Sequence, residues 1–338
     1  MSHQARFKLE VQHWPYRQTI RISRGELRAQ TLLHATANWG EICAQGEGEQ
    51  HESDEEKSEV ALTRGLAALR WLEAMPDRAE LRRRLPPDGL RNALDAMLWD
   101  LECKRKGLRA WELAGLHGVN ADSRFRTLLT VTLDSADAMA AQARRWGDAP
   151  LLKVKLGDRS PGGPDRDIER LRAVADASPG STLTVDPNEG WTPASLQRFA
   201  SAVAALPVAL IEQPLPAGHE DLLPGLALRI PVAADESCTS LDSLARLAGR
   251  VQYLNLKLDK SGGLTEALLM CEEARRLGLK LMVGCNCGTS LAMAPAFLVA
   301  AFCEFVDLDG PLHMRDDRAP AVSYEGGLLH APDAALWG

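Results

Sequence analysis

The sequence predicts an α/β protein in which a closed barrel of parallel strands follows a separate N-terminal region. One pattern, a short apolar strand and then an amphipathic helix, repeats from Leu128 onward, and its strand ends recur every 22 to 31 residues. Each step has the length of one strand and one helix. Eight strands within about 185 residues favour a closed barrel over an open sheet. The first 125 or so residues lack this pattern.

The strand ends are apolar runs that stop at a charged residue, a threonine or a glycine. We expect them at Thr132, Lys155, Asp186, Glu212, Asp235, Lys257, Gly284 and Asp309. A doubly wound open sheet is the alternative, and it is weakened because no GxGxxG follows the first strand. We place the barrel at residues 126–312 and expect the tail, residues 313–338, to return to the N-terminal part.

The N-terminal region, residues 1–125, has the pattern of a small α+β domain. Segments 6–22 and 28–45 carry alternating and β-branched residues that predict strands, and segments 57–75 and 88–106 have the spacing of amphipathic helices. The acidic stretch 46–59 predicts a solvated loop before the first helix. The alternative is a mobile lid over a site.

Composition narrows the class of protein. The net charge of −7 argues against a general nucleic-acid binder, and no apolar run approaches the roughly 20 residues that span a bilayer. The first residues carry no apolar signal core, and the 7 cysteines are scattered. These features predict a cytoplasmic protein that binds neither membrane nor nucleic acid.

Three acidic residues, Asp186, Glu212 and Asp235, end three successive strands. The active site of such a barrel lies at the carboxyl ends of the strands, so these side chains should converge. Because three buried carboxylates repel one another, we expect a hard cation among them, Mg²⁺ or Mn²⁺. Asn188 and Glu236 would support these ligands. The alternative is that each acid pairs separately with a lysine or arginine.

Lysines end two strands that lie opposite each other in an eight-stranded barrel. Lys153 and Lys155 share one face of the second strand, and Lys257 ends the sixth. Two ammonium groups near a metal ion should lower each other's pKa, which makes a lysine a usable base. Opposed lysines suit removal of a proton from one face of a carbon beside a carboxylate and its return to the other. The alternative is ordinary ion pairing with the three acids.

The last two strands suggest substrate contacts. Gly284 and Cys285 lie where the seventh strand ends, and a glycine there allows close backbone approach or simply a tight turn. Asp307 and Asp309, two residues apart on the eighth strand, form a carboxylate pair that we expect far from the metal and suited to a substrate ammonium group. The alternatives are a helix cap or pairing with the lysines.

The ordered motifs resemble those of the enolase superfamily and, within it, the dipeptide epimerases of the L-Ala-D/L-Glu type. The resemblance rests on KVK (153–155), VDPNEGW (185–191), IEQP (211–214), ADES (234–237), NLKLDKSGGLTEA (255–267) and DLDGP (307–311). It covers nearly the whole chain and implies a (β/α)7β modified TIM barrel with an N-terminal α+β capping domain. It also implies an isomerase of peptidoglycan recycling that inverts the C-terminal residue of a dipeptide.

The resemblance implies a role for each matched residue. Asp186, Glu212 and Asp235 would bind one Mg²⁺ per subunit, with Mn²⁺ as an alternative. Lys155 and Lys257 would be the acid and base, Lys153 would stabilise the enolate, and Asp307 and Asp309 would hold the substrate ammonium group. Arg24 would bind a distal carboxylate, with Arg17 and Arg21 as alternatives.

Other reactions and assemblies stay open at this point. The acidic stretch 46–59 differs from the Pro/Tyr-containing loop of the Ala-Glu epimerases, so the preferred dipeptide is undefined. Cycloisomerases and o-succinylbenzoate synthases also place lysines on strands two and six, but their substrates carry no ammonium group. A non-catalytic metal-binding or interaction protein on the same barrel is the third alternative. A homo-oligomer is also open.

Overall fold

The structure is a computed structural model that describes residues 6–49, 55–72 and 77–338. The strands are β1 (Arg6–Ile22), β2 (Gly25–Trp39), β3 (Ile42–Glu49), β4 (Arg124–Arg126), β5 (Leu129–Val131), β6 (Leu151–Lys155), β7 (Thr182–Asp186), β8 (Val208–Glu212), β9 (Val232–Ala234), β10 (Tyr253–Leu256), β11 (Lys280–Gly284), β12 (Phe305–Asp307), β13 (Tyr324–Glu325) and β14 (Leu328–His330).

The α-helices are α1 (Glu55–Leu72), α2 (Arg78–Arg84), α3 (Gly89–Lys106), α4 (Ala110–Leu113), α5 (Ala136–Arg145), α6 (Gly163–Ala177), α7 (Pro193–Ala202), α8 (Leu244–Leu247), α9 (Leu258–Ser261), α10 (Leu264–Arg276), α11 (Ser290–Ala300) and α12 (Gly310–His313). The described residues also form the 3-10 helices η1 (Glu220–Leu226) and η2 (Leu241–Ser243). None of the described helices is long and apolar enough to cross a bilayer.

The central sheet is a nearly closed barrel of eight parallel strands, β5 to β12 in sequence order, as the sequence predicts. A parallel bridge between Thr127 and Val306 joins its first and last edges. The strand ends differ slightly from expectation, because β9 stops one residue before Asp235 and β10 one before Lys257. β12 ends at Asp307, so Asp309 lies beyond the strand.

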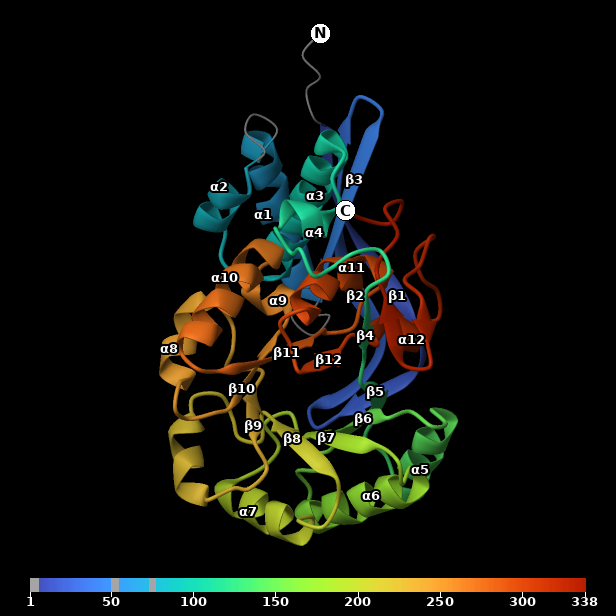
Figure 1. The fold of residues 1–338 in the computed structure, drawn as a ribbon, viewed down its shortest axis with the longest axis vertical. Helices are drawn as coiled ribbons and strands as arrows, with labels where there is room; N and C mark the ends of the chain where they lie inside the picture. Colours follow the sequence, from blue (N-terminus) through green and yellow to red (C-terminus); the bar gives the residue numbers. More distant parts are fainter. Residues whose placement is uncertain (1–5, 50–54, 73–76) are drawn as a thin grey trace.

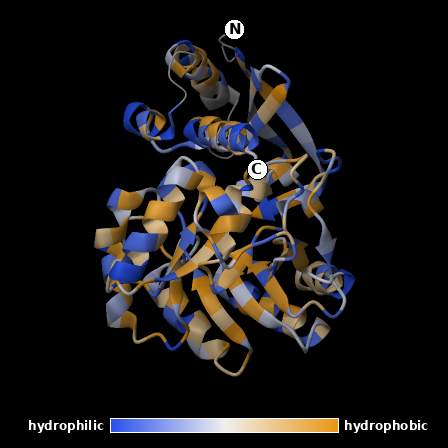
Figure 2. Ribbon diagram, turned by 45° about the horizontal axis from the view of Figure 1, so that its top comes forward, coloured by the Kyte–Doolittle hydropathy of each residue, from blue (hydrophilic) through white to orange (hydrophobic). Residues whose placement is uncertain are grey.

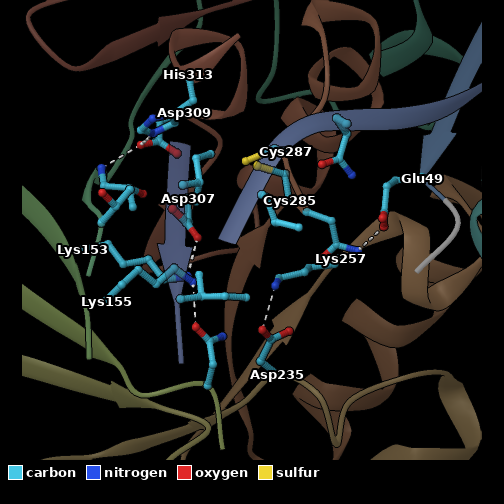
Figure 3. A pocket seen from close by; sticks show the side chains of 18 of the residues that line it. Glu49, Lys153, Lys155, Asp235, Lys257, Cys285, Cys287, Asp307, Asp309 and His313 are labelled. Carbon is cyan, nitrogen blue, oxygen red and sulfur yellow. Dashed lines mark hydrogen bonds and ion pairs between the residues drawn. The ribbon is translucent and has the colours of Figure 1, made fainter. Parts of the chain in front are cut away.

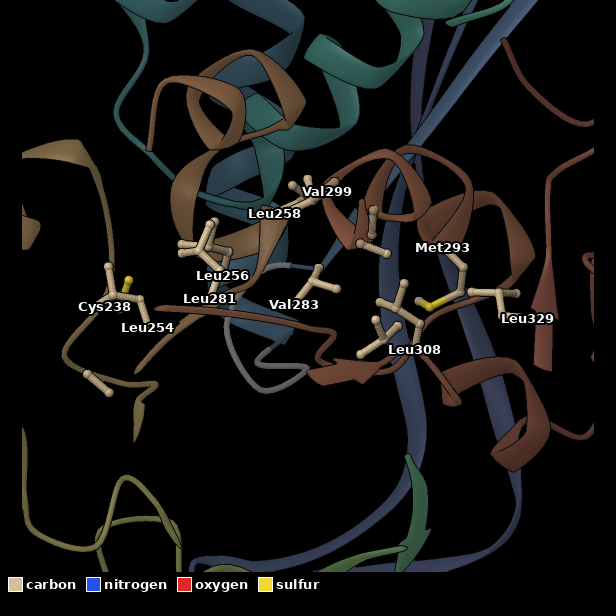
Figure 4. Close-up of a cluster of buried hydrophobic side chains, with 14 of the residues drawn as sticks. Cys238, Leu254, Leu256, Leu258, Leu281, Val283, Met293, Val299, Leu308 and Leu329 are labelled. Atoms are coloured by element: carbon tan, nitrogen blue, oxygen red, sulfur yellow. The ribbon is translucent and has the colours of Figure 1, made fainter. Parts of the chain in front are cut away.

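Side chains along each barrel strand point alternately outward and into the barrel, and this alternation positions the site. Outward residues pack against the surrounding helices, as Leu254 and Leu256 of β10 do in the cluster of Figure 4. Inward residues at the lower end of the barrel form a small apolar layer that includes Tyr253 and Met282. Further along the same inward faces the side chains become charged, so an apolar floor lies beneath a polar upper layer.

An antiparallel sheet, β1-β2-β3, and the helices α1 to α3 cover the barrel. The hydropathy colouring in Figure 2 shows helices of this part with mixed apolar and polar faces, and their buried residues form a separate apolar cluster. The bounds of the predicted strand 28–45 are wrong. This segment contains most of β2, a turn at Gly40 with φ 60° and the first half of β3. The helix predicted at 57–75 corresponds to α1, which begins at Glu55. The predicted end at residue 75 lies outside the described residues.

The acidic stretch 46–59 is not a loop throughout. Residues 46–49 belong to β3 and α1 begins at Glu55, whereas residues 50–54 lie outside the described residues. Gly46 and Gly48 face α3 so closely that a Cβ would lie 2.2 Å and 2.1 Å from backbone oxygens of that helix. Glu47 and Glu49 therefore point the other way, toward the barrel, and both are buried. Glycine serves close packing here, not a turn.

The C-terminal tail contacts both parts of the molecule. β14 pairs with β4 beside the barrel, and the indole of Trp337 donates a 2.9 Å hydrogen bond to the Ala96 carbonyl of α3. The Gly338 carbonyl accepts from the Ala110 amide at 3.0 Å. These contacts fix α3 and the chain end together, and Figure 1 shows the C-terminus close to the capping helices.

Candidate active site

A cavity of about 140 Å³ lies at the carboxyl ends of the barrel strands, between them and the sheet β1-β2-β3. Its walls include most of the predicted site residues, from both strand ends and the capping part. Figure 3 shows Lys153 and Lys155 entering from one side and Lys257 from the other, as predicted. The cavity therefore presents two ammonium-bearing sides to whatever it binds.

Asp186, Glu212 and Asp235 come together on the barrel wall, as predicted. One oxygen of each carboxylate lies within 4.8 Å of the others, and all three side chains are buried. Burial and the neighbouring Asp186 raise the pKa of Glu212 to about 8. Its Oε2 accepts no hydrogen bond from the described residues, although Lys153 Nζ lies 2.8 Å away. Three oxygens at this spacing fit one divalent cation.

Polar neighbours hold these carboxylates in place. The amide of Asn188 donates to Asp186 Oδ1 at 2.9 Å, and its side chain donates to Asp186 Oδ2 at 3.2 Å and to Glu236 at 3.3 Å. Asn255 Nδ2 donates to Glu212 Oε1 at 2.8 Å. Of the two supporting positions expected, Asn188 therefore contacts the acidic cluster directly, and Glu236 contacts Asn188.

Lys153 is the central cation of the site. Its Nζ lies 2.7 Å from Asp307 Oδ2, 2.8 Å from Glu212 Oε2 and 3.3 Å from Asp186 Oδ2. One nitrogen thus contacts both the acidic cluster and the eighth strand. The expectation that Asp307 lies far from the metal position is wrong, since the barrel interior is narrow enough for one lysine to bridge it.

Lys155 and Lys257 each contact one end of the acidic cluster. Lys155 Nζ donates to Asp186 Oδ2 at 2.6 Å, and Lys257 Nζ donates to Asp235 Oδ2 at 2.7 Å. Both lysines line the cavity, and neither side chain is more than 14% exposed. The alternative of ion pairing with the acids is therefore realised together with the opposed placement, and the two interpretations do not exclude each other.

The lysine pKa values depart from expectation. Burial favours the neutral amine of Lys153, but the carboxylates of Asp307, Glu212 and Asp186 outweigh it and raise its pKa well above the usual value. Burial likewise favours the neutral amine of Lys257, and Asp235 raises its pKa above the usual range. In the metal-free protein, the lowering expected from a neighbouring ammonium group is not seen at Lys153, because three carboxylates surround its Nζ.

Asp307 and Asp309 both line the cavity, but each already contacts a basic group. Asp307 accepts from Lys153, whereas Asp309 Oδ2 accepts from the Thr130 amide at 2.7 Å and lies 3.0 Å from His313 Nε2. Burial opposes the charge of His313, but Asp309 raises the pKa of the imidazole above its usual value. The pairing alternative for Asp307 is therefore observed.

Arg24 lines the cavity from the turn between β1 and β2. Its Nη1 lies 2.6 Å from Glu236 Oε1 and 3.4 Å from Glu189 Oε2. Arg21, one alternative, pairs with Glu26 and Asp134 and does not line this cavity. Arg17, the other, lines a neighbouring cavity. Arg24 is thus the arginine of the three that reaches the site.

Gly284 and Cys285 contribute in different ways. A Cβ at Gly284 would lie 2.7 Å from Asn255 Oδ1, so glycine leaves room for the side chain that supports Glu212. Cys285 lines the cavity, and burial raises the pKa of its thiol well above the usual value. A neutral thiol is a small apolar wall and not a nucleophile.

Four further residues line or support the site that the sequence reasoning missed. Asn255 lies two residues before Lys257, so strand alternation alone would place it on the same inward face. Lys260 Nζ contacts Asp235 Oδ1 at 2.5 Å, and Glu49 accepts from Asn286 Nδ2 at 3.1 Å. His313 follows the eighth strand after one short turn. No local motif marks Glu49, because the contact depends on how the cap sits on the barrel.

Replacing Lys153 with methionine should strongly destabilise the metal-free protein. The change leaves Asp186, Glu212 and Asp307 without their shared cation, and loss of one partner of a buried ion pair costs about 3 to 5 kcal/mol. Chemical denaturation with a chelator present measures this change. Lys280→Met is the control, since its pair with Glu304 is half exposed and should leave stability nearly unchanged. Equal effects would contradict the buried role.

The comparisons with known proteins agree with this geometry. The family model described as enolase C-terminal domain-like matches residues 138–335. N-acetyl-D-glutamate racemase of Pseudoalteromonas sp is 39% identical over 260 residues, covering 77% of this chain and 79% of the relative. L-Ala-D/L-Glu epimerase of Escherichia coli is 36% identical over 325 residues, covering 96% and 98%.

Two solved structures extend the likeness to the whole fold. An enolase family member from Agrobacterium tumefaciens with homology to dipeptide epimerases, holding sodium and L-Ala-L-Glu, has a TM-score of 0.92 and 38% identity, covering 99% of this chain and 100% of that one. A dipeptide epimerase from Methylococcus capsulatus, complexed with Mg and L-Arg-D-Lys, has a TM-score of 0.85 and 28% identity, covering 98% of each chain. The chain therefore belongs to the enolase superfamily, among its epimerases and racemases, and is an isomerase.

Proposed function

We propose that the protein is a metal-dependent dipeptide epimerase that inverts the α-carbon of the C-terminal residue by proton transfer through an enolate. The observation that carries the proposal is the placement of Lys155 and Lys257 on opposite sides of a cavity beside three buried carboxylates. Inversion needs a proton removed from one face of the carbon and delivered to the other. Two opposed lysines can serve both faces without movement of the substrate.

Asp186, Glu212 and Asp235 would hold one divalent cation per subunit. Their all-oxygen donor set favours Mg²⁺, with Mn²⁺ as the alternative. When bound, such a cation supplies positive charge that stabilises the negative charge forming on the substrate carboxylate and lowers the pKa of nearby lysines. By holding this cation between the two lysines, the three residues would determine where the substrate carboxylate binds.

The three lysines would divide the remaining work. The neutral amine of one outer lysine, Lys155 or Lys257, takes the α-proton, and the ammonium of the other returns one on the opposite face. Their roles exchange for the other epimer. Lys153 keeps its proton, because the carboxylates around it raise its pKa, so its positive charge faces the developing enolate.

The rest of the cavity would recognise the two ends of the substrate. Asp307 and Asp309 would hold the ammonium group of the first residue. Arg24 would bind a distal carboxylate, as a glutamate side chain offers, in exchange for its contacts with Glu189 and Glu236. Cys285, which lines the cavity, would form part of the wall beside the reacting carbon, and Gly284 precedes it at the end of β11.

A second candidate is racemisation of an N-acylated amino acid, and one observation favours it. Lys153 and His313 already contact Asp307 and Asp309, so these carboxylates do not need a substrate cation. An N-acyl group carries no charge at that position. The N-acetyl-D-glutamate racemase relative fits this candidate, and the L-Ala-D/L-Glu epimerase relative fits the first. Both candidates share the lysine chemistry and differ at the amino end of the substrate.

Solvent exchange in D₂O, followed by ¹H NMR, separates these candidates. We expect loss of the C-terminal α-proton signal and appearance of the second epimer with L-Ala-L-Glu. Exchange with N-acetyl-L-glutamate alone would establish the second candidate. Turnover of a muconate-type acid or an o-succinylbenzoate precursor, with no exchange in either glutamate compound, would contradict both.

Replacing Arg24 with glutamine tests the distal carboxylate contact. We expect KM for L-Ala-L-Glu to rise about tenfold, because a charge-assisted hydrogen bond contributes about 1.5 to 3 kcal/mol. KM for L-Ala-L-Gln should change much less. Arg28→Gln is the matched control, since that side chain is 84% exposed and does not line the cavity. A rise for both substrates alike would mean that Arg24 only supports the loop.

A further inference from the structure

A second cavity, of about 220 Å³, adjoins the active-site cavity. The two share Ile20, Thr130, Thr132 and His313 in their walls. The remaining walls come from β1 before Ile20, the end of α5 and the start of the C-terminal tail. The shared residues include His313, which contacts Asp309, so the second cavity opens beside the amino end of the proposed substrate position.

The walls of this second cavity are positively charged. Arg17 and Arg145 line it from β1 and α5, and both are exposed. Within residues 6–49, 55–72 and 77–338, neither arginine makes an ion pair with a carboxylate, and no aspartate or glutamate lines the cavity. Asp309, which contacts the shared residue His313, lines the first cavity but not the second.

Several other polar groups of the second cavity are hydrogen-bonded within the protein. Gln142 Oε1 accepts from the Thr132 amide at 2.8 Å, and the indole of Trp146 donates to the Thr130 carbonyl at 3.0 Å. Trp146 also packs edge-on against the His313 ring, at 6.2 Å between centroids. These contacts make a fixed floor, and the guanidinium groups of Arg17 and Arg145 are charged donors that have no carboxylate partner among the described residues.

We propose that this second cavity is an anion-binding subsite for a carboxylate carried by the amino-terminal part of the substrate. Arg17 and Arg145 would bind that carboxylate, which either the acidic side chain of a first residue or a dicarboxylic acyl group can supply. The inference rests on the proposed function, because that function orients the amino end toward Asp307 and Asp309. Guanidinium groups match carboxylate geometry, and an acid-free wall leaves no internal competitor.

Isosteric substrates test this subsite. L-Glu-L-Glu and L-Gln-L-Glu differ only in the charge of the first side chain, and N-succinyl-L-glutamate and its terminal amide, N-succinamoyl-L-glutamate, form the corresponding acyl pair. For the pair of substrates that the enzyme accepts, we expect the charged member to have the lower KM. The KM values are determined from the rates of α-proton exchange in D₂O. Preference in the dipeptide pair identifies an acidic first residue, and preference in the acyl pair identifies a dicarboxylic acyl group.

The double variant Arg17→Gln, Arg145→Gln should remove this preference. We expect the KM ratio between the two members to fall about tenfold, since each exposed ion pair contributes up to a factor of about five. Arg144→Gln is the matched control, because Arg144 is exposed on the same helix but does not line the cavity. Thermal unfolding of all three proteins confirms that they are folded.

Two results would overturn the subsite. An unchanged KM ratio in the double variant, or an equal fall of the KM ratio in Arg144→Gln, would show that the second cavity does not discriminate between charged and neutral substrates. Absence of exchange with every glutamate substrate is a different failure, which overturns the proposed function and the substrate orientation with it.

Discussion

Replacing either Lys155 or Lys257 with alanine is expected to lower the rate of epimerisation by about 10³-fold or more, the range for loss of a general acid or base. Each lysine reaches the cavity from its own side, so neither can replace the other. Polarimetry or chiral chromatography of the product measures this rate. The expected loss is in kcat, since the substrate carboxylate and amino group are held by other residues.

The two variants should differ in the exchange that they retain. One variant should still exchange the α-proton of the L,L epimer with solvent, and the other should still exchange that of the L,D epimer. This residual, one-sided exchange also shows that each variant is folded, although each lysine neutralises a carboxylate at 2.6 or 2.7 Å. Full epimerisation by either variant would rule out its lysine as a catalytic residue.

Removal of divalent metal should abolish activity and lower thermal stability. The three carboxylates repel one another in a buried position, so a cation that binds them stabilises the folded state. At a concentration about 100-fold above the dissociation constant, this contribution is about 2.7 kcal/mol. Differential scanning calorimetry with and without Mg²⁺ measures it, and readdition of Mg²⁺ after chelation should restore activity.

Asp235→Asn should remove both the activity and the Mg²⁺-dependent rise in the unfolding temperature. Glu236→Gln is the control, because Glu236 is the next residue in the chain but does not belong to the cluster of three. It should retain the rise in temperature. A Mg²⁺ effect that persists in Asp235→Asn, or an enzyme fully active in excess chelator, would contradict the metal assignment.

The barrel and its charged rim could be predicted because both follow from local sequence. Each strand is a short apolar run, and the strand period of two sends Lys153 and Lys155 of one strand, and Asn255 and Lys257 of another, to the inward face of the barrel. The fold then brings the carboxyl ends of all the strands to the same rim. The residues at the predicted strand ends therefore include the acidic cluster and the lysines Lys155 and Lys257. Chain order alone sets their positions around the ring.

The parts that could not be predicted depend on distances across the molecule. Gly46 and Gly48 suggest a loop, but the segment is a strand because it pairs with β2, and glycine there leaves room for α3. The ion pair between Lys153 and Asp307 depends on the width of the barrel, and it contributes to the raised pKa of Lys153. The His313 contact with Asp309 depends on the short helix α12 after the last strand.

The origin of the proton in the product tests the central claim, two lysines acting on opposite faces, most directly. The reaction of wild-type protein with Mg²⁺ and L-Ala-L-Glu is run in D₂O and sampled at early times. N-acetyl-L-glutamate replaces the dipeptide if that is the substrate. The account predicts product that is fully deuterated at the inverted α-carbon, while unreacted substrate still carries its proton. Product that retains the substrate's own proton would contradict it, since a single group would then have moved one proton between the faces.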